Sequence, residues 1–244
     1  METLAPWLAV VAAYLIGSLS FAVIFSRLMG LADPRSYGSG NPGATNVLRS
    51  GNKAAAILTL LFDALKGWLP VVLVLQFGKP WGLGEATAAF VGLAAFVGHL
   101  WPVFFRFQGG KGVATAAGVL FGINPLLGVA TLATFGVLVF FTRYVSLGSV
   151  AAALLAPFYQ ALIWGPSALL LALVPMCLLL VWRHMGNIRK LLAGTENKLG
   201  QKAAAAAPAA PATEHPHVPG QAHAHHAAKL HKTFHKHKQH KGHH

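Results

Sequence analysis

Long runs of apolar residues divide this chain and constrain its fold more than any other feature. The first run, Leu4–Leu28, is long enough for one helix to cross roughly 30 Å of hydrocarbon. It lacks the basic start and the short apolar core of a signal peptide. Charged residues make up only 10% of the sequence, against roughly 25% in soluble domains. The sequence therefore predicts an all-α integral membrane protein, a polytopic helix bundle.

Seven transmembrane helices are expected, one of them short. Ala114–Ile123 would reach only about half of the bilayer, so protein should shield part of it from lipid. Asn124 and Pro125 predict the N-cap and first turn of the next helix. A five-span alternative, with 114–141 as one bent re-entrant hairpin, remains open. The expected spans are Leu4–Leu28, Ala54–Phe77, Ala86–Phe105, Ala114–Ile123, Pro125–Phe141, Ser146–Trp164 and Ala168–Trp182.

Basic residues gather in the connections on one side of this predicted bundle, and the connections on the other side carry little charge. Because Lys and Arg favour short cytoplasmic loops, seven crossings place the N-terminus outside and the C-terminus in the cytoplasm. An excess of positive charge at a membrane surface also suits anionic substrates. The basic residues are Arg27, Arg35, Arg49, Lys53, Arg106, Lys111, Arg143, Arg183, Arg189 and Lys190.

The first basic loop contains the stretch GSGNPGATNVLR, from Gly38 to Arg49. Its small residues allow the backbone to approach an anion closely, and Arg49 supplies a bidentate cation. A plain connecting turn is the alternative, but such a turn does not need so many hydrogen-bond donors. Ser39 and Arg49 are candidate catalytic residues. The candidate substrate-binding residues of this loop are Gly38, Gly40, Asn41, Thr45 and Asn46.

The second loop follows a hydrophobic span and contains Gly109, Gly110, Lys111 and Gly112. A glycine turn at a helix start offers free N–H groups and the positive end of the helix dipole, and Lys111 adds a full charge. This pattern favours a phosphate cradle over a tight turn alone. It is not a Walker A loop, because Phe105 stands where that motif requires glycine and no Ser or Thr follows the lysine. No nucleotide or nucleic acid is expected.

Further candidates flank these loops. His99 could be a base, a phosphate ligand or a histidine satisfied by the backbone. Asn187 follows the last span closely enough to reach a site between helices, and Glu196 ends the same polar segment, which otherwise suggests a surface helix on lipid. Asp63 and Lys66 share a helix face at i, i+3, which predicts an intramembrane ion pair that positions the loops.

Residues 201–244 differ in composition from the rest of the chain. They are rich in Ala and Pro and then in His and Lys, and they hold eleven of the thirteen histidines. We expect a disordered cytoplasmic tail that is dispensable or an affinity handle, with metal or lipid-headgroup binding as the alternative. Cys177 is expected to be a buried, inert side chain, and no metal site or cofactor is expected in residues 1–200.

Three stretches, GSGNPGATNVLR, GHLWPVFFRFQGGKGVAT and NIRKLLAGTE, occur in this order and on one predicted face. Together they resemble the three motifs of the PlsY family, the bacterial membrane acyl-phosphate:glycerol-3-phosphate acyltransferases. The resemblance covers about residues 4–200. It implies transfer of a fatty acyl group from acyl phosphate to the 1-hydroxyl of sn-glycerol 3-phosphate, giving lysophosphatidic acid and phosphate in the first step of phospholipid synthesis.

The resemblance also implies roles, partners and a location. Ser39, Arg49 and Asn187 would hold glycerol 3-phosphate, the 109–112 turn would hold acyl phosphate, and His99 would orient one phosphate. The donor's own phosphate would take the proton, with His99 or Glu196 as protein alternatives. Partners would be membrane lipids and a soluble enzyme that makes the acyl phosphate. The protein would be a multi-pass protein of the bacterial inner membrane, with its active site facing the cytoplasm.

Two other functions remain as alternatives at this point. A transporter of small phosphate esters would also carry intramembrane charges and basic loops, but it predicts internal repeats that the sequence does not show. A non-enzymatic lipid-binding scaffold would not need this set of polar side chains. Neither histidine in residues 1–200 is followed by an acid five residues later, an arrangement on which thioester-using relatives rely, so use of acyl-CoA is disfavoured.

Overall fold

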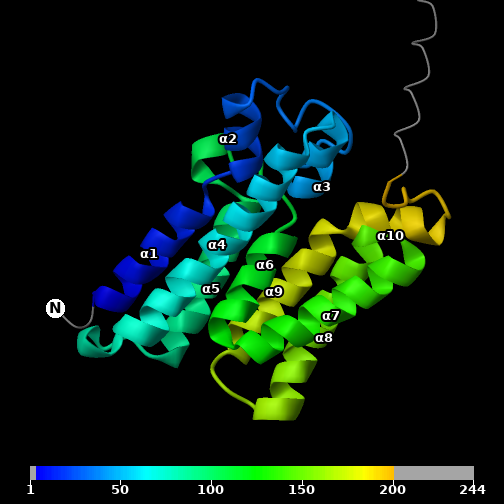
Figure 1. Cartoon of the computed structure of the whole chain (residues 1–244). Helices are drawn as coiled ribbons and strands as arrows, with labels where there is room; N and C mark the ends of the chain where they lie inside the picture. Colours follow the sequence, from blue (N-terminus) through cyan, green and yellow to red (C-terminus); the bar gives the residue numbers. More distant parts are fainter. Residues whose placement is uncertain (1–3, 201–244) are drawn as a thin grey trace, which may run out of the picture. The chain divides into compact units, whose positions relative to one another are not determined.

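The computed structural model describes residues 4–200, and the predicted tail at 201–244 lies outside them. This part of the chain is all-helical and contains no strand, as the sequence predicts (Figure 1). The helices are α1 (Ala5–Gly17), α2 (Phe21–Leu28), α3 (Ala44–Val47), α4 (Lys53–Phe77), α5 (Glu85–Leu100), α6 (Val113–Ile123), α7 (Pro125–Thr142), α8 (Val145–Trp164), α9 (Leu170–Arg183) and α10 (Met185–Leu192), with the 3₁₀ turns η1 (Leu48–Ser50), η2 (Lys79–Trp81) and η3 (Val103–Phe105).

The first expected span is broken rather than continuous. α1 and α2 meet at an angle of 42° after a three-residue break, so the prediction of one helix over Leu4–Leu28 is wrong in this detail. The Lys66 ammonium donates to the Leu19 carbonyl at 2.7 Å. A break leaves backbone N–H and C=O groups without helical hydrogen-bond partners, and lipid cannot bind these groups. Lys66 of α4 supplies a partner for one of them.

In the described part of the chain, the number of candidate spans depends on how the bent helix pairs are counted, and it includes the five-span alternative but does not reach seven. Within residues 4–200, four helices are long and apolar enough to cross a membrane, and up to six spans result if each bent pair counts as one. The pair α9 and α10 bends by 56°, and α6 is a separate, shorter apolar helix. The seven-crossing topology and its orientation therefore remain predictions.

The short helix α6 is enclosed by protein, as its length predicts. Each of its residues is buried or half-buried. It packs mainly on α4, where small residues let the backbones touch: a Cβ on Gly118 would overlap the Ala64 carbonyl, and one on Gly67 would overlap the Thr115 carbonyl. Backbone contact of this kind replaces the lipid contact that a full-length span would make.

Two helices begin at asparagine residues whose side chains cap the helix N-terminus. The Asn124 side chain accepts from Leu126 N–H at 2.9 Å and caps α7, with Pro125 in the first turn as predicted. Asn52 caps α4 in the same way. Figure 1 shows α2, α3 and α10 at one end of the bundle and the α4–α5 and α8–α9 connections at the other. The three polar loops thus gather at one end.

Candidate active site

A cavity of about 780 Å³, which we call the main cavity, opens among these three loops and continues between the helices. Its polar end is lined by side chains from the segment after α2, from the α5–α6 connection and from the segment after α9. Its apolar part is lined by residues such as Leu120, Phe135, Ala152, Leu173 and Met176 of α6, α7, α8 and α9. One space therefore offers both a charged end and a hydrocarbon-like arm.

Most of the site residues predicted from the sequence meet here, although they come from distant parts of the chain. Four predicted glycines, Gly38, Gly40, Gly109 and Gly110, shape the loops without lining the cavity. The predicted residues that line it are Ser39, Asn41, Thr45, Asn46, Arg49, His99, Lys111, Gly112, Asn187 and Glu196.

Asn46 organises the first loop. Its side-chain oxygen accepts from Ser39 N–H at 3.0 Å, and its amide donates to the carbonyls of Pro34 at 2.6 Å and Tyr37 at 3.1 Å. The side chain is buried. Since both ends of this amide are occupied by backbone groups, Asn46 serves to fold the loop and to hold Ser39 at the cavity.

The second loop fits tightly against the end of α5. Gly110 N–H donates to the His99 carbonyl at 3.1 Å. This amide is therefore not free to bind an anion, contrary to the prediction from the sequence. A Cβ on Gly110 would lie 3.0 Å from the Pro42 carbonyl, which places the first and second loops in contact. Gly112 has φ +84° and its Cβ would overlap the Phe96 ring. Close approach requires glycine at both positions, and the positive φ of Gly112 favours glycine there as well.

Arg183, at the end of α9, braces this turn. Its guanidinium donates to the Gly110 carbonyl at 3.1 and 2.9 Å and to the Gly109 carbonyl at 2.9 Å. The sequence showed Arg183 only as a basic residue at a span end. Its role depends on a contact across more than seventy residues, which sequence spacing does not reveal.

A chain of hydrogen bonds links the second and third loops at the polar end. The Lys111 ammonium donates to the Asn187 side-chain oxygen. The Asn187 amide donates to Glu196 Oε1 at 2.7 Å, and Ser146 Oγ donates to the same oxygen at 2.7 Å. The Glu196 carboxylate thereby fixes which way Asn187 faces, and Asn187 fixes the position of the ammonium.

Burial lowers the pKa of Lys111 to about 8. The Glu196 carboxylate opposes this shift, while the nearby cations of Arg183, Lys190 and Arg49 add to it. A buried ammonium among other cations is poorly solvated and favours an anion as its next neighbour. The polar end of the main cavity is thus built to receive negative charge.

His99 and Asp63 line the main cavity where α4 meets α5. Asp63 and Lys66 form the predicted ion pair, with Oδ1 and Nζ 2.7 Å apart and both side chains buried. His99 Nδ1 lies 3.7 Å from Asp63 Oδ1, too far for a hydrogen bond. His99 is therefore next to a buried carboxylate but not clamped by it.

Several polar residues that line the main cavity had no role in the sequence analysis, among them Ser146, Ser149 and His184. Ser146 and Ser149 come from α8, and His184 lies between α9 and α10. His184 Nδ1 is 2.8 Å from the Leu180 carbonyl, so the ring proton is on Nδ1 and Nε2 is an acceptor. In the sequence, the only indication of a role for His184 was its position three residues before Asn187. Cys177 is a free, buried thiol in the apolar lining.

No group of three His, Cys, Asp or Glu side chains suited to a metal ion occurs in residues 4–200.

Comparison with known proteins identifies the family. A profile of the glycerol-3-phosphate acyltransferase family matches residues 7–194. The glycerol-3-phosphate acyltransferase of Paraburkholderia phytofirmans is 63% identical over 202 residues, which cover 83% of this chain and 94% of the relative. That of Cupriavidus necator is 58% identical, with coverage of 82% and 98%.

A solved structure of the integral membrane glycerol 3-phosphate acyltransferase PlsY, in its glycerol 3-phosphate form, has a TM-score of 0.75 at 37% identity and covers 80% of this chain and 96% of that one. Its lysophosphatidic acid form has a TM-score of 0.73 at 36% identity, with coverage of 80% and 95%. This chain therefore belongs to the PlsY-type glycerol-3-phosphate acyltransferases and is an acyltransferase of phospholipid biosynthesis.

Proposed function

We propose that this protein transfers a fatty acyl group from acyl phosphate to the 1-hydroxyl of sn-glycerol 3-phosphate, producing 1-acyl-sn-glycerol 3-phosphate and phosphate. The observation that carries the proposal is the main cavity itself, in which Arg49 and Lys111 stand at one end and an apolar arm runs between α6, α7, α8 and α9. Both substrates carry phosphate and one carries a hydrocarbon tail. The solved relatives in glycerol 3-phosphate and lysophosphatidic acid forms support this substrate and product.

The side chains suggest a division of labour. Ser39, Arg49 and Asn187 hold the phosphate of the acceptor, and Lys111 with Gly112 at the start of α6 holds the phosphate of the donor. The helix dipole and the Lys111 charge stabilise negative charge that develops on the acyl oxygen. His99, adjacent to the loop that carries Lys111, orients a phosphate group. The apolar arm takes the acyl chain.

The transfer itself is a direct displacement. The acceptor's hydroxyl oxygen forms a bond to the acyl carbon, the bond from that carbon to the phosphate oxygen breaks, and the departing phosphate accepts the hydroxyl proton. Acyl phosphate is already activated, so positioning and charge stabilisation supply most of the catalysis. Glu196 already accepts two hydrogen bonds and fixes Asn187, which favours a positioning role for it over that of base.

The active site is proposed to face the cytoplasm of a bacterial inner membrane. The loops around the main cavity carry the clusters of Arg and Lys, and short basic loops stay on the cytoplasmic side. A soluble enzyme that makes acyl phosphate would then deliver the donor from that side. Membership of an acyltransferase family favours an enzyme over the phosphate-ester transporter and the scaffold considered above.

The test is a donor comparison on purified protein in detergent. Acyl phosphate, acyl-CoA and acyl carrier protein are each supplied with glycerol 3-phosphate, and lysophosphatidic acid and phosphate are measured. We expect product with acyl phosphate alone, and equal amounts of the two products. Faster turnover with acyl-CoA or acyl carrier protein would overturn the donor assignment, and an acyl-enzyme trapped without acceptor would overturn direct displacement.

A further inference from the structure

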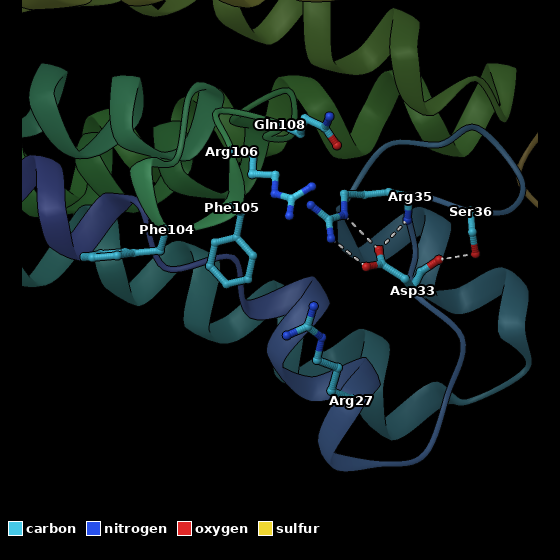
Figure 2. Close-up of a pocket in the computed structure, with 8 residues that line it drawn as sticks. All are labelled: Arg27, Asp33, Arg35, Ser36, Phe104, Phe105, Arg106 and Gln108. Atoms are coloured by element: carbon cyan, nitrogen blue, oxygen red, sulfur yellow. Dashed lines mark hydrogen bonds and ion pairs between the residues drawn. The ribbon is translucent and has the colours of Figure 1, made fainter.

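A second cavity, of about 550 Å³, lies outside the main cavity, and none of the residues that line it lines the main cavity. We call it the arginine pocket. It is formed by Arg27 at the end of α2, by Asp33 and Arg35 in the loop that follows, and by Phe104 and Arg106 in the α5–α6 connection. Figure 2 shows Arg35 and Arg106 pointing toward one another, with Arg27 reaching toward the same opening from α2.

The charges in the arginine pocket do not balance. Asp33 is the one carboxylate among the described residues that line it, and Arg35 already occupies both of its oxygens, with Nη2–Oδ2 at 2.7 Å and Nε–Oδ1 at 2.9 Å. That hydrogen-bonded pairing holds the pKa of Asp33 below its usual value, so the group stays ionised. Within residues 4–200, Arg27 and Arg106 form no ion pair. Two guanidinium charges are left to face the opening.

The backbone around Arg106 adopts a conformation that is unfavourable for residues other than glycine. Arg106 and Phe107 are consecutive non-glycine residues with φ of +55° and +58°. Such a conformation is unfavourable for a non-glycine residue and persists where the surroundings enforce it, often at ligand sites. Here Phe107 N–H donates to the Pro102 carbonyl at 2.9 Å and Gln108 N–H to the Phe105 carbonyl at 3.1 Å, which lock the strained turn.

An apolar rim adjoins these charges. Phe104, which lines the pocket, is 57% exposed, and Leu28, next to Arg27 at the end of α2, is 75% exposed. Guanidinium groups recognise phosphate oxygens through paired hydrogen bonds. A ligand that satisfies both features carries a phosphate attached to hydrocarbon, and the basic end of a membrane helix is where anionic lipid headgroups are found.

We propose that the arginine pocket binds the phosphate headgroup of an anionic membrane phospholipid, held by Arg27, Arg35 and Arg106, with its acyl chains against Leu28 and Phe104. This lipid is not a substrate. Its phosphate bridges the two loops that also build the active site, because Arg35 lies three residues before Gly38 and Arg106 lies five before Lys111. The bound lipid therefore orders both loops and raises the rate of acyl transfer.

The experiment compares the full chain with Arg27→Gln, Arg106→Gln and the double variant, in nanodiscs of phosphatidylcholine with increasing fractions of phosphatidylglycerol. Arg189→Gln is the matched control, because Arg189 is an exposed arginine of α10 that lines neither cavity. Native mass spectrometry counts the phosphatidylglycerol molecules retained, which does not depend on activity. Acyl transfer is measured in the same discs, and thermal unfolding identifies any variant that fails to fold.

We expect the wild type and Arg189→Gln to retain phosphatidylglycerol and to gain activity as its fraction rises. The pocket variants should bind it about tenfold more weakly, since each loses a charge-assisted hydrogen bond, and should keep the phosphatidylcholine rate without the gain. If Arg106→Gln does not fold, lipid retention by Arg27→Gln alone is compared with that of the wild type and the control. Equal retention of phosphatidylglycerol by the wild type, the control and every folded pocket variant would overturn the site.

A second arm distinguishes a lipid headgroup from free phosphate. Inorganic phosphate is titrated into pure phosphatidylcholine discs and into discs that already hold phosphatidylglycerol. Failure of phosphate to raise the rate or to displace the lipid supports the lipid as occupant. Displacement and the same variant-sensitive gain with phosphate alone would overturn the lipid and assign the pocket to a soluble phosphate.

Discussion

Lys111 is the cation that connects the second loop to the third loop at the polar end of the main cavity. It is half-buried, and its ammonium donates a hydrogen bond to Asn187. Neighbouring cations lower its pKa. A lysine that is poorly solvated and partly deprotonated near neutral pH responds strongly to its surroundings. Changes at Lys111 and at the carboxylate behind it should therefore be visible in kinetics.

Replacing the ammonium of Lys111 should abolish most of the catalysis. In Lys111→Gln the side chain is one atom shorter and carries no charge, and the loss of a charge-assisted contact of about 3 kcal/mol corresponds to roughly a hundredfold loss in kcat/KM. Lys79→Gln is the matched control, because Lys79 is exposed at the opposite end of the bundle. A wild-type rate in Lys111→Gln would remove this lysine from the site.

The KM for acyl phosphate should depend on pH through Lys111. Its pKa is about 8 in the free protein, and a bound phosphate raises it, so binding takes up a proton between the two pKa values. Affinity is then fully present below the free-protein pKa and falls as the pH rises above about 8, by at most about tenfold per unit. Initial rates at several pH values measure this. A pH-dependent KM for glycerol 3-phosphate instead would reassign Lys111 to the acceptor.

Glu196→Gln should shift the pH dependence of the KM for acyl phosphate to lower pH. The amide oxygen can still accept from Ser146 and Asn187, but the charge that raises the pKa of Lys111 is gone. The rise in KM should therefore begin at a lower pH than in the wild type, with a smaller effect on kcat at low pH. The shift is read from the same rate measurements. An unchanged profile would show that Glu196 acts on Lys111 only through geometry.

At the scale of helices, α4 and α6 form the contact that places the second loop. Gly67 and Gly118 let the two backbones approach until carbonyl groups of one helix meet the Cα positions of the other. The N-terminus of α6 carries Lys111 and Gly112, so the spacing of this helix pair sets the position of the proposed phosphate site. Packing in membranes relies on such close approach because apolar side chains gain little over lipid.

Gly118→Ala should separate these helices and destabilise the fold. The added Cβ overlaps the Ala64 carbonyl, and overpacking of this kind typically costs about 1–3 kcal/mol. Gly136→Ala in α7 is the matched control, since nothing lies within 4 Å of its Cβ. We expect a lower midpoint of thermal unfolding in detergent for Gly118→Ala, and an unchanged or higher one for Gly136→Ala. Equal midpoints would show that α6 can shift without cost.

At the scale of the whole molecule, the proposed site residues all precede residue 201. The family profile stops at residue 194, and the named site residues lie between Gly38 and Glu196. A chain that ends at Gly200 should therefore keep its acyl-transfer rate within about twofold, an allowance for small effects on the fold. Purified full-length and truncated protein are compared in the same detergent. A tenfold loss would give the tail a function.

The sequence by itself determined the membrane class, the all-helical fold and the three polar loops, because apolar run length and glycine-rich turns are local properties. Spacing along one helix also predicted the Asp63–Lys66 pair. Only the tertiary structure decided that Asn46 folds its own loop, that Arg183 braces the glycine turn and that Glu196 accepts a hydrogen bond from Asn187. These contacts join segments that no local pattern connects, and the break after α1 is stabilised by a lysine from another helix.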